Sequence, residues 1–153
     1  MKRSKRLEPV RRVAKNKEAA AAQKMGDSVQ KKASDDSQLE KLKKYRDDYI
    51  AEFKTKGEQG ISASRLQEYQ TFVQKIDRAI VEQIKTVKST QQQVEVHKKD
   101  FQKMNSRKKV VEKLIDKSVK QEFKNEQRKE QNEADDRPSS GGTREDVLMW
   151  RLT

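Results

Sequence analysis

The sequence contains few of the residues that interrupt or cross-link a chain. It has no cysteine, which excludes disulfide bonds and thiolate metal sites and agrees with a reducing cytosol. It has two prolines and five glycines, and none of them lies between residues 61 and 136. Because proline and glycine are the strongest helix breakers, this gap predicts one long, uninterrupted helix.

Long apolar runs are also missing. Hydrophobic residues make up 31% of the chain and aromatic residues 5%, which is too little for a compact domain with a thick core. No uncharged apolar stretch is long enough to span a bilayer, and no apolar segment follows the basic first residues. We therefore expect a soluble, cytoplasmic protein that is not secreted by the general route.

Charge is abundant, since 41% of the residues are charged and the formal net charge is +12. Lys, Glu, Gln, Arg and Ala dominate, and these residues lose little on entering a helix. Residues 1–32 carry 11 Lys or Arg against 3 Asp or Glu, and residues 65–133 carry 17 against 11. Such basic blocks favour an acidic protein, an anionic membrane surface or nucleic acid as partner, and charge alone does not choose among them.

A heptad repeat runs through the second half of the chain. Its positions, three and four residues apart in turn, are Leu66, Tyr69, Val73, Ile76, Ile80, Gln83, Val87, Thr90, Val94, His97, Phe101, Met104, Lys108, Val111 and Ile115. Eleven of these fifteen residues are apolar or aromatic. A period of 3.5 kept over about seven heptads is the signature of a coiled coil, and it predicts a helix over about 64–133.

A second apolar stripe precedes it, formed by Leu39, Leu42, Tyr45, Tyr49 and Phe53. It predicts a first helix over about 7–54, with Pro9 in its first turn. Residues 55–64 contain Gly57 and Gly60, which can reverse the chain, and Ser62 and Ser64, either of which can cap the next helix. The fold class is therefore all-α: a long antiparallel two-helix coiled-coil hairpin over 1–133, followed by a flexible tail over 134–153.

The hairpin predicts which residues face each other, because partners should have numbers that sum to about 118 or 119. This rule pairs Phe53 with Leu66, Tyr49 with Tyr69 and Leu7 with Val111. The predicted seam, the row on each helix that faces the other, contains Leu39, Leu42, Tyr49, Phe53, Leu66, Tyr69, Val73, Ile80, Val87, Val94, Phe101, Met104 and Val111. In its middle Ser28, Lys32 and Asp35 lie near Gln83, Val87 and Thr90, so we expect tight packing beside the turn and poor packing farther along.

No constellation for catalysis or cofactor binding is present. The only histidine, His97, falls on the seam, where a packed side chain is the simpler interpretation than a metal ligand. A two-helix hairpin offers no dry concave pocket for general acid or base chemistry, and the sequence has no phosphate-binding loop. We expect no enzyme activity, no cofactor and no metal.

The segment YRDDYIAEFKTKGEQGISASRLQEYQTFVQKIDRAIVEQ, residues 45–83, resembles the flagellar export protein family FliJ. The resemblance lies in two tyrosines four residues apart, a Gly-x-x-Gly-Ile turn, the pattern Leu-Gln-x-Tyr-Gln-x-Phe and an Ala-Ile-x-x-Gln ending. It implies a coiled-coil stalk of the type III export apparatus at the cytoplasmic face of the inner membrane. The implied partners are the hexameric export ATPase, which the end with both termini would enter, the cytoplasmic part of the membrane export gate, and export chaperones.

The resemblance also implies positions that contact the export gate, here called the gate set: Phe72, Ile76, Ala79 and Gln83. Phe72 lies beside the heptad positions, so we expect it to be partly exposed and to be explained by a partner. Ile76 and Gln83 also lie on the seam, where packing explains them equally well. The family also has histidine where Gln83 stands, so no pH-linked role is expected at this position.

At the opposite end, basic residues should gather if the hairpin closes. This basic cluster comprises Lys2, Arg3, Lys5, Arg6, Arg11, Arg12, Lys108, Lys109 and Lys113. Our hypothesis is that it meets acidic groups lining the pore of the ATPase ring, where charge complementarity would steer insertion.

Three alternatives remain at this point. The equivalent stalk of a virulence type III secretion system would share the hairpin, although the turn motif favours the flagellar family. A basic helical protein that binds nucleic acid would show steeply salt-dependent binding, but acidic residues interrupt most of the basic tracts, and we expect no nucleic acid. A structural coiled coil without these partners would affect no ATPase.

Overall fold

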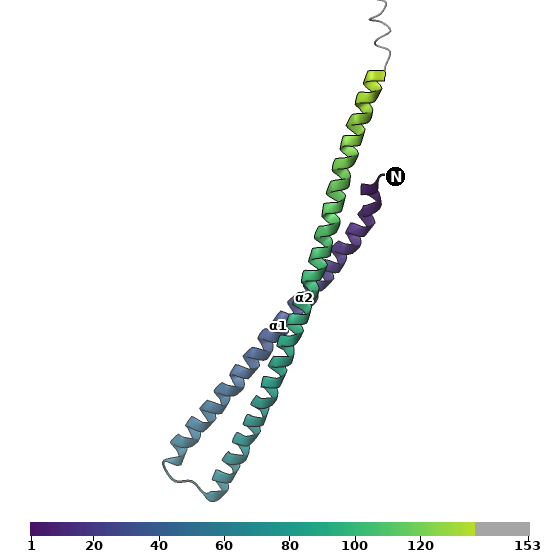
Figure 1. The fold of residues 1–153 in the computed structure, drawn as a ribbon. Helices are drawn as coiled ribbons and strands as arrows, with labels where there is room; N and C mark the ends of the chain where they lie inside the picture. Colours follow the sequence, from purple (N-terminus) through teal and green to yellow (C-terminus); the bar gives the residue numbers. More distant parts are fainter. Residues whose placement is uncertain (137–153) are drawn as a thin grey trace, which may run out of the picture. The chain divides into compact units, whose positions relative to one another are not determined.

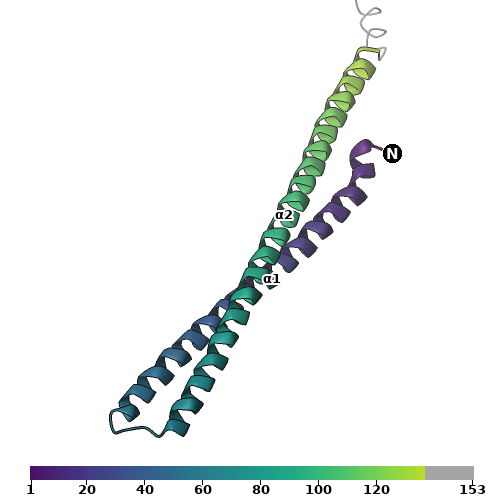
Figure 2. The same ribbon diagram turned by 60° about the horizontal axis from the view of Figure 1, so that its bottom comes forward.

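The structure is a computed structural model that describes residues 1–136 as two helices, α1 (Arg3–Gly57) and α2 (Ala63–Asp136). Residues 58–62 join them, and the described part of the chain contains no strand. Figure 1 and Figure 2 both show α1 and α2 extending to the same side of this turn, so the chain runs in opposite directions along the two helices. The predicted all-α helical hairpin is confirmed.

The helices are longer than the sequence suggested. Because α1 begins at Arg3, Pro9 lies inside the helix and not in its first turn. Proline has no backbone N–H, so the hydrogen bond from residue 9 to the carbonyl of Lys5 is missing. At the other end α2 continues to Asp136, which makes residues 134–136 of the expected tail helical. The remainder of that tail, 137–153, lies outside the described residues.

The turn depends on two glycines and one serine. Gly60 has φ of 95°, a left-handed conformation that favours glycine. A Cβ on Gly57 would lie 2.8 Å from Cδ1 of Ile61, so a larger residue there would displace the turn. The backbone N–H of Arg65 donates to Oγ of Ser62 at 3.2 Å, which identifies Ser62 as the residue that caps α2.

The described residues form two compact units, residues 15–106 and residues 1–14 with 107–136. In the first of these, here called the turn unit, burial follows the heptads of both helices. Ala21, Ser28, Ile76 and Thr90 are buried. Half-buried seam residues are Leu39, Leu42, Tyr49, Phe53, Tyr69, Val73, Ile80, Val87, Val94, Phe101 and Met104.

One predicted seam residue is wrongly placed. Leu66 is 44% exposed, and Phe53 stacks on Tyr69 instead. A helical side chain leans toward the N-terminus of its own helix. In an antiparallel pair, each of two residues whose side chains meet therefore lies about one position later in the sequence than the residues whose backbones are directly opposite. The numbers of contacting residues sum to 122 for Phe53 with Tyr69 and to 123 for Glu18 with Asn105. The predicted pair of Tyr49 with Tyr69, which sums to 118, is also in contact.

The second unit, here called the terminal unit, combines residues 1–14 of α1 with residues 107–136 of α2. Ile115 and Ser118 are its buried residues, and Leu7 and Val111 are half-buried. Ser4 bonds to Glu122, and these two numbers sum to 126 and not to 118 or 119. The start of α1 therefore meets a later part of α2 than the sequence rule indicated. The pairing of Leu7 with Val111 stays a prediction.

Candidate functional site

Five aromatic rings pack together beside the turn. The rings of Phe53 and Tyr69 stack with centroids 3.6 Å apart, and Tyr49 stacks on Tyr69 at 5.7 Å. Phe72 lies against Tyr49 at 4.5 Å and meets Tyr45 edge to face at 6.1 Å. Aromatic pairs in such geometries stabilise a structure beyond the area they bury, so this cluster ties α1 to α2 next to the turn.

Two members of the gate set reach the surface to different degrees. Phe72 is half-buried, and its contacts with Tyr45 and Tyr49 explain its position by packing within the hairpin. The expectation that a partner was needed to explain this ring is therefore wrong. Ala79 is exposed and lies seven residues, or two helical turns, farther along the same side of α2.

The other two members belong to the seam. Ile76 is 6% exposed and forms part of the small apolar core of the turn unit. Gln83 is half-buried, and its Nε2 donates to the backbone carbonyl of Asp35 at 3.0 Å. The four residues therefore do not form one exposed surface, and only Phe72 and Ala79 offer side-chain area to a partner.

An ion pair flanks this region. The Arg46 guanidinium bonds to the Asp77 carboxylate across the two helices, and both side chains remain partly exposed. The hydrogen bond and the charge of Asp77 raise the pKa of Arg46 above its ordinary value. Since arginine is already charged at physiological pH, the pair contributes to alignment of the helices and not to titration.

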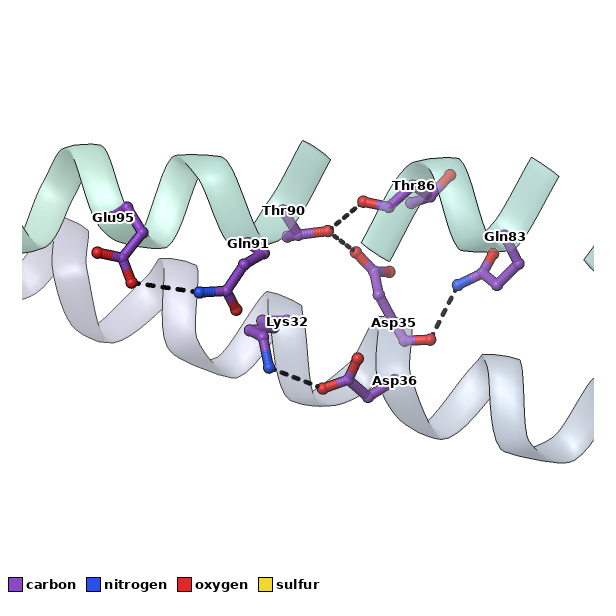
Figure 3. Close-up of polar contacts among 8 residues, drawn as sticks. All are labelled: Lys32, Asp35, Asp36, Gln83, Thr86, Thr90, Gln91 and Glu95. Atoms are coloured by element: carbon purple, nitrogen blue, oxygen red, sulfur yellow. Dashed lines mark hydrogen bonds and ion pairs between the residues drawn. The ribbon is translucent and has the colours of Figure 1, made fainter. Parts of the chain in front are cut away.

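The middle of the turn unit is polar but well bonded. Thr90, 2% exposed, donates its hydroxyl hydrogen bond to Oδ2 of Asp35 at 2.7 Å and also reaches the carbonyl of Thr86. Figure 3 shows Asp35 lying between Thr90 and Gln83. Every fully enclosed side-chain nitrogen or oxygen in residues 1–136 has a partner. Hydrogen bonds therefore satisfy the polar groups of the seam here, while the looser packing expected for this part stays a prediction.

The basic cluster is spread along the terminal unit. Its two seam members, Arg11 and Lys108, are half-buried, and its other members are exposed. Lys2 pairs with Glu126 at 3.5 Å, whereas Lys113 precedes Glu126 by thirteen residues, about 20 Å of helix. The cluster is thus an extended basic surface interrupted by carboxylates, and not a single ring of cations.

Glu122 of α2 caps the start of α1. Its carboxylate accepts the backbone N–H of Ser4 at 2.9 Å and the Ser4 hydroxyl at 2.7 Å. The first turn of α1 has no acidic residue of its own, so Glu122 supplies the negative charge that a helix N-terminus favours. These bonds to Ser4, with a smaller effect of Lys2, hold the pKa of Glu122 below its ordinary value.

A cavity of about 340 Å³ lies beside this cap. Lys2 and Arg3 of α1 and Lys117 and Ser118 of α2 are among its lining residues. Neither Lys117 nor Ser118 was predicted, because the last apolar position of the heptad repeat is Ile115. One further step of three residues leads to Ser118, a polar residue at a position where the repeat requires an apolar one.

Other types of site find no support in the described residues. No group of three or more His, Cys, Asp or Glu side chains in residues 1–136 is placed to hold a metal ion. His97 is half-buried on the seam of the turn unit. Within the same residues, neither helix has a stretch apolar enough to cross a bilayer.

Comparison with known families shows which family the chain belongs to. A family model described as Flagellar FliJ protein matches residues 3–141. The chain belongs to the FliJ family. No curated protein and no solved structure matches the chain significantly.

The matched range extends over both units of this FliJ-family chain. It contains the whole gate set and every member of the basic cluster except Lys2. Membership in the family, together with the helical hairpin, identifies the chain as a coiled-coil protein associated with flagellar export.

Proposed function

We propose that this protein is the stalk of a flagellar type III export ATPase. The end that carries residues 1–14 inserts into the hexameric ATPase ring and promotes its assembly and activity. The turn end contacts the cytoplasmic part of the membrane export gate, and the chain also binds export chaperones. It acts without an active site or cofactor of its own, at the cytoplasmic face of the inner membrane.

The observation that carries this proposal is the FliJ match over nearly the whole chain. The basic surface of the terminal unit supports the ATPase contact, because exposed cations such as Arg6, Arg12 and Lys109 would attract acidic groups in a ring pore. A stalk must also hold its partners at separate places, and a two-helix hairpin provides different side chains at its turn and at its termini.

For the gate contact we propose a smaller set than the family resemblance implied. Phe72 and Ala79 would touch the gate directly, because both have accessible area on one side of α2. Ile76 and Gln83 would act from beneath by holding that side of α2 against α1. The turn unit thus presents a rigid surface whose aromatic ring is already fixed by Tyr45 and Tyr49.

The test of the stalk is ATP hydrolysis by the cognate export ATPase, measured together with hexamer formation, in the presence and absence of the chain. Stimulation of both supports the proposal. A virulence stalk would act preferentially on the ATPase of that system, and a nucleic-acid-binding protein would bind DNA with a steep salt dependence and leave hydrolysis unchanged.

A further inference from the structure

The cavity in the terminal unit has an excess of positive charge that the chain itself leaves unpaired. Lys2, one of its three cations, pairs with Glu126 at 3.5 Å. Arg3 and Lys117 have no ion-pair partner among residues 1–136. The carboxylate of Glu122 also lines the cavity, but the backbone N–H and hydroxyl of Ser4 already occupy it.

The hydroxyl of Ser118 is a second polar feature of the cavity. Only 8% of this residue is exposed, and its hydroxyl has no hydrogen-bond partner among residues 1–136, so its oxygen is accessible from the cavity, because every enclosed side-chain oxygen in these residues is bonded. The other two buried hydroxyl residues are satisfied: Ser28 donates to the carbonyl of Lys24, and Thr90 donates to Asp35. Ser118 lines the cavity beside the two unpaired cations, so its hydroxyl can donate to a group that enters.

The geometry points to a binding site for one carboxylate side chain, an aspartate or glutamate, presented by a partner protein. Arg3 and Lys117 provide the opposite charges, and the Ser118 hydroxyl donates a hydrogen bond. Leu114, 39% exposed, lies at the same cavity and can cover the methylene groups of the incoming residue. The identification of that partner as the export ATPase rests on the proposed function.

A single carboxylate fits this environment better than a polyanion. Glu126, Glu130 and Glu133 follow the cavity along α2 and are exposed. A nucleic acid or an anionic membrane would place a row of negative charges against them and be repelled. Glu122 lines the cavity and Glu126 pairs with Lys2, so a single acidic side chain, which brings one charge, is repelled less than a polyanion.

The first experiment measures binding of the full chain to a fluorescent peptide with a single glutamate among neutral residues, by fluorescence anisotropy, with the same peptide carrying glutamine instead as reference. The site variants are Arg3→Gln with Lys117→Gln, and separately Ser118→Ala. The matched control is Lys120→Gln with Lys124→Gln, which removes two exposed cations of the same helix that do not line the cavity. Circular dichroism verifies that all variants remain helical.

We expect each site variant to weaken glutamate-peptide binding about tenfold or more, because hydrogen bonds to a charged group contribute at that level. The control should change binding less than about twofold. Equal losses in site and control variants would reduce the site to a general basic surface and overturn the inference, as would unchanged binding by Ser118→Ala. If inorganic phosphate or phosphatidylglycerol vesicles bind more tightly than the peptide, and the site variants weaken that binding, the site takes another anion and the carboxylate is overturned as its ligand.

Stimulation of the export ATPase by the same variants separates this inference from the proposed function. If the wild-type chain stimulates hydrolysis and the site variants do not, the carboxylate comes from the ATPase. If the site variants stimulate hydrolysis to the same extent as the wild type, the ATPase is not the source of the carboxylate. If no form of the chain stimulates hydrolysis, the proposed function fails, and the peptide measurement alone decides whether the site exists.

Discussion

The hydroxyl of Thr90 on α2 donates a hydrogen bond to Oδ2 of Asp35 on α1 at 2.7 Å. Thr90 is the most completely buried side chain among the described residues, although the heptad repeat would favour an apolar residue there. Polar residues at single seam positions are known to fix which residues of two helices face each other, at some cost in stability. We interpret this bond as the contact that fixes the register of the turn unit.

The first prediction concerns this bond. Thr90→Val keeps the shape of the side chain but leaves the Asp35 carboxylate without its donor, so the free energy of unfolding should fall by about 1–3 kcal/mol. Thr86→Val is the matched control, because the exposed Thr86 hydroxyl bonds only within its own helix and its loss should cost no more than about 0.5 kcal/mol. Urea unfolding followed by circular dichroism measures both values. A Thr90→Val protein as stable as the wild type would show that the bond is incidental.

The second prediction contrasts two apolar residues beside the turn. Phe53→Ala removes a ring stacked on Tyr69 and should lower the free energy of unfolding by about 2 kcal/mol or more. Leu66→Ala should change it by less than about 0.5 kcal/mol, because Leu66 is 44% exposed. Thermal unfolding of the two variants is the measurement. A larger loss for Leu66→Ala would mean that the original pairing of Phe53 with Leu66 was right.

The third prediction concerns the cap of α1 by Glu122. Because bonds to Ser4 lower its pKa in the folded state, the ionised carboxylate stabilises that state. This contribution is complete above the ordinary value of 4.5 and is lost as the pH falls through the lowered pKa. Hydrogen-exchange protection of the first turns of α1 should therefore fall below pH 4.5. Glu122→Ala should lower the protection at neutral pH several-fold and remove the pH dependence.

Glu126→Ala is the control for the cap, since Glu126 forms only an exposed pair with Lys2. It should leave protection of the first turns of α1 nearly unchanged. Equal protection in Glu122→Ala and wild type at neutral pH would show that Ser4 does not need this acceptor. Pro9 makes the result informative, because the helix before it lacks one backbone hydrogen bond and depends more on the cap.

The fourth prediction tests the narrowed gate set. Ala79→Arg places a long charged side chain on an exposed position and should abolish capture of the cytoplasmic gate domain without changing thermal stability. Gln74→Arg, which introduces the same charge at another exposed position of α2, should bind like the wild type. Pull-down and calorimetry with the purified gate domain provide the readout. Wild-type affinity in Ala79→Arg would exclude this side of α2 as the contact.

The sequence was sufficient for the parts of the fold that depend on local rules. A heptad repeat indicated the second helix and an apolar stripe the first, and two glycines with a serine at 62 or 64 indicated the turn. The exact partners were not predictable, because they depend on the lean of side chains and on contacts between distant residues. Leu66 followed the repeat yet is exposed, and the bond between Ser4 and Glu122 has no signal in either local sequence.

The candidate sites, like the fold, could be predicted from the sequence only in part. Family resemblance indicated Phe72, but only the structure shows that Tyr45 and Tyr49 hold its ring. The basic cluster was visible as composition, whereas the pairing of Lys2 with Glu126 required coordinates. Ser118 is informative because a small polar residue on a seam looks unremarkable until its burial and its missing partner are known.

The most direct test of the stalk is the rate of ATP hydrolysis and the extent of hexamer formation by the cognate ATPase, measured with three forms of the chain. These are the wild type, a reversal of four exposed cations of the terminal unit, and a matched reversal in the turn unit. The terminal reversal changes Arg6, Arg12, Lys109 and Lys113 to Glu, and the matched one changes Lys17, Lys31, Lys41 and Lys88 to Glu. We expect stimulation by the wild type and the turn-unit reversal and its loss with the terminal reversal. Stimulation by all three forms would contradict the placement of the ATPase contact, and stimulation by none would contradict the stalk function itself.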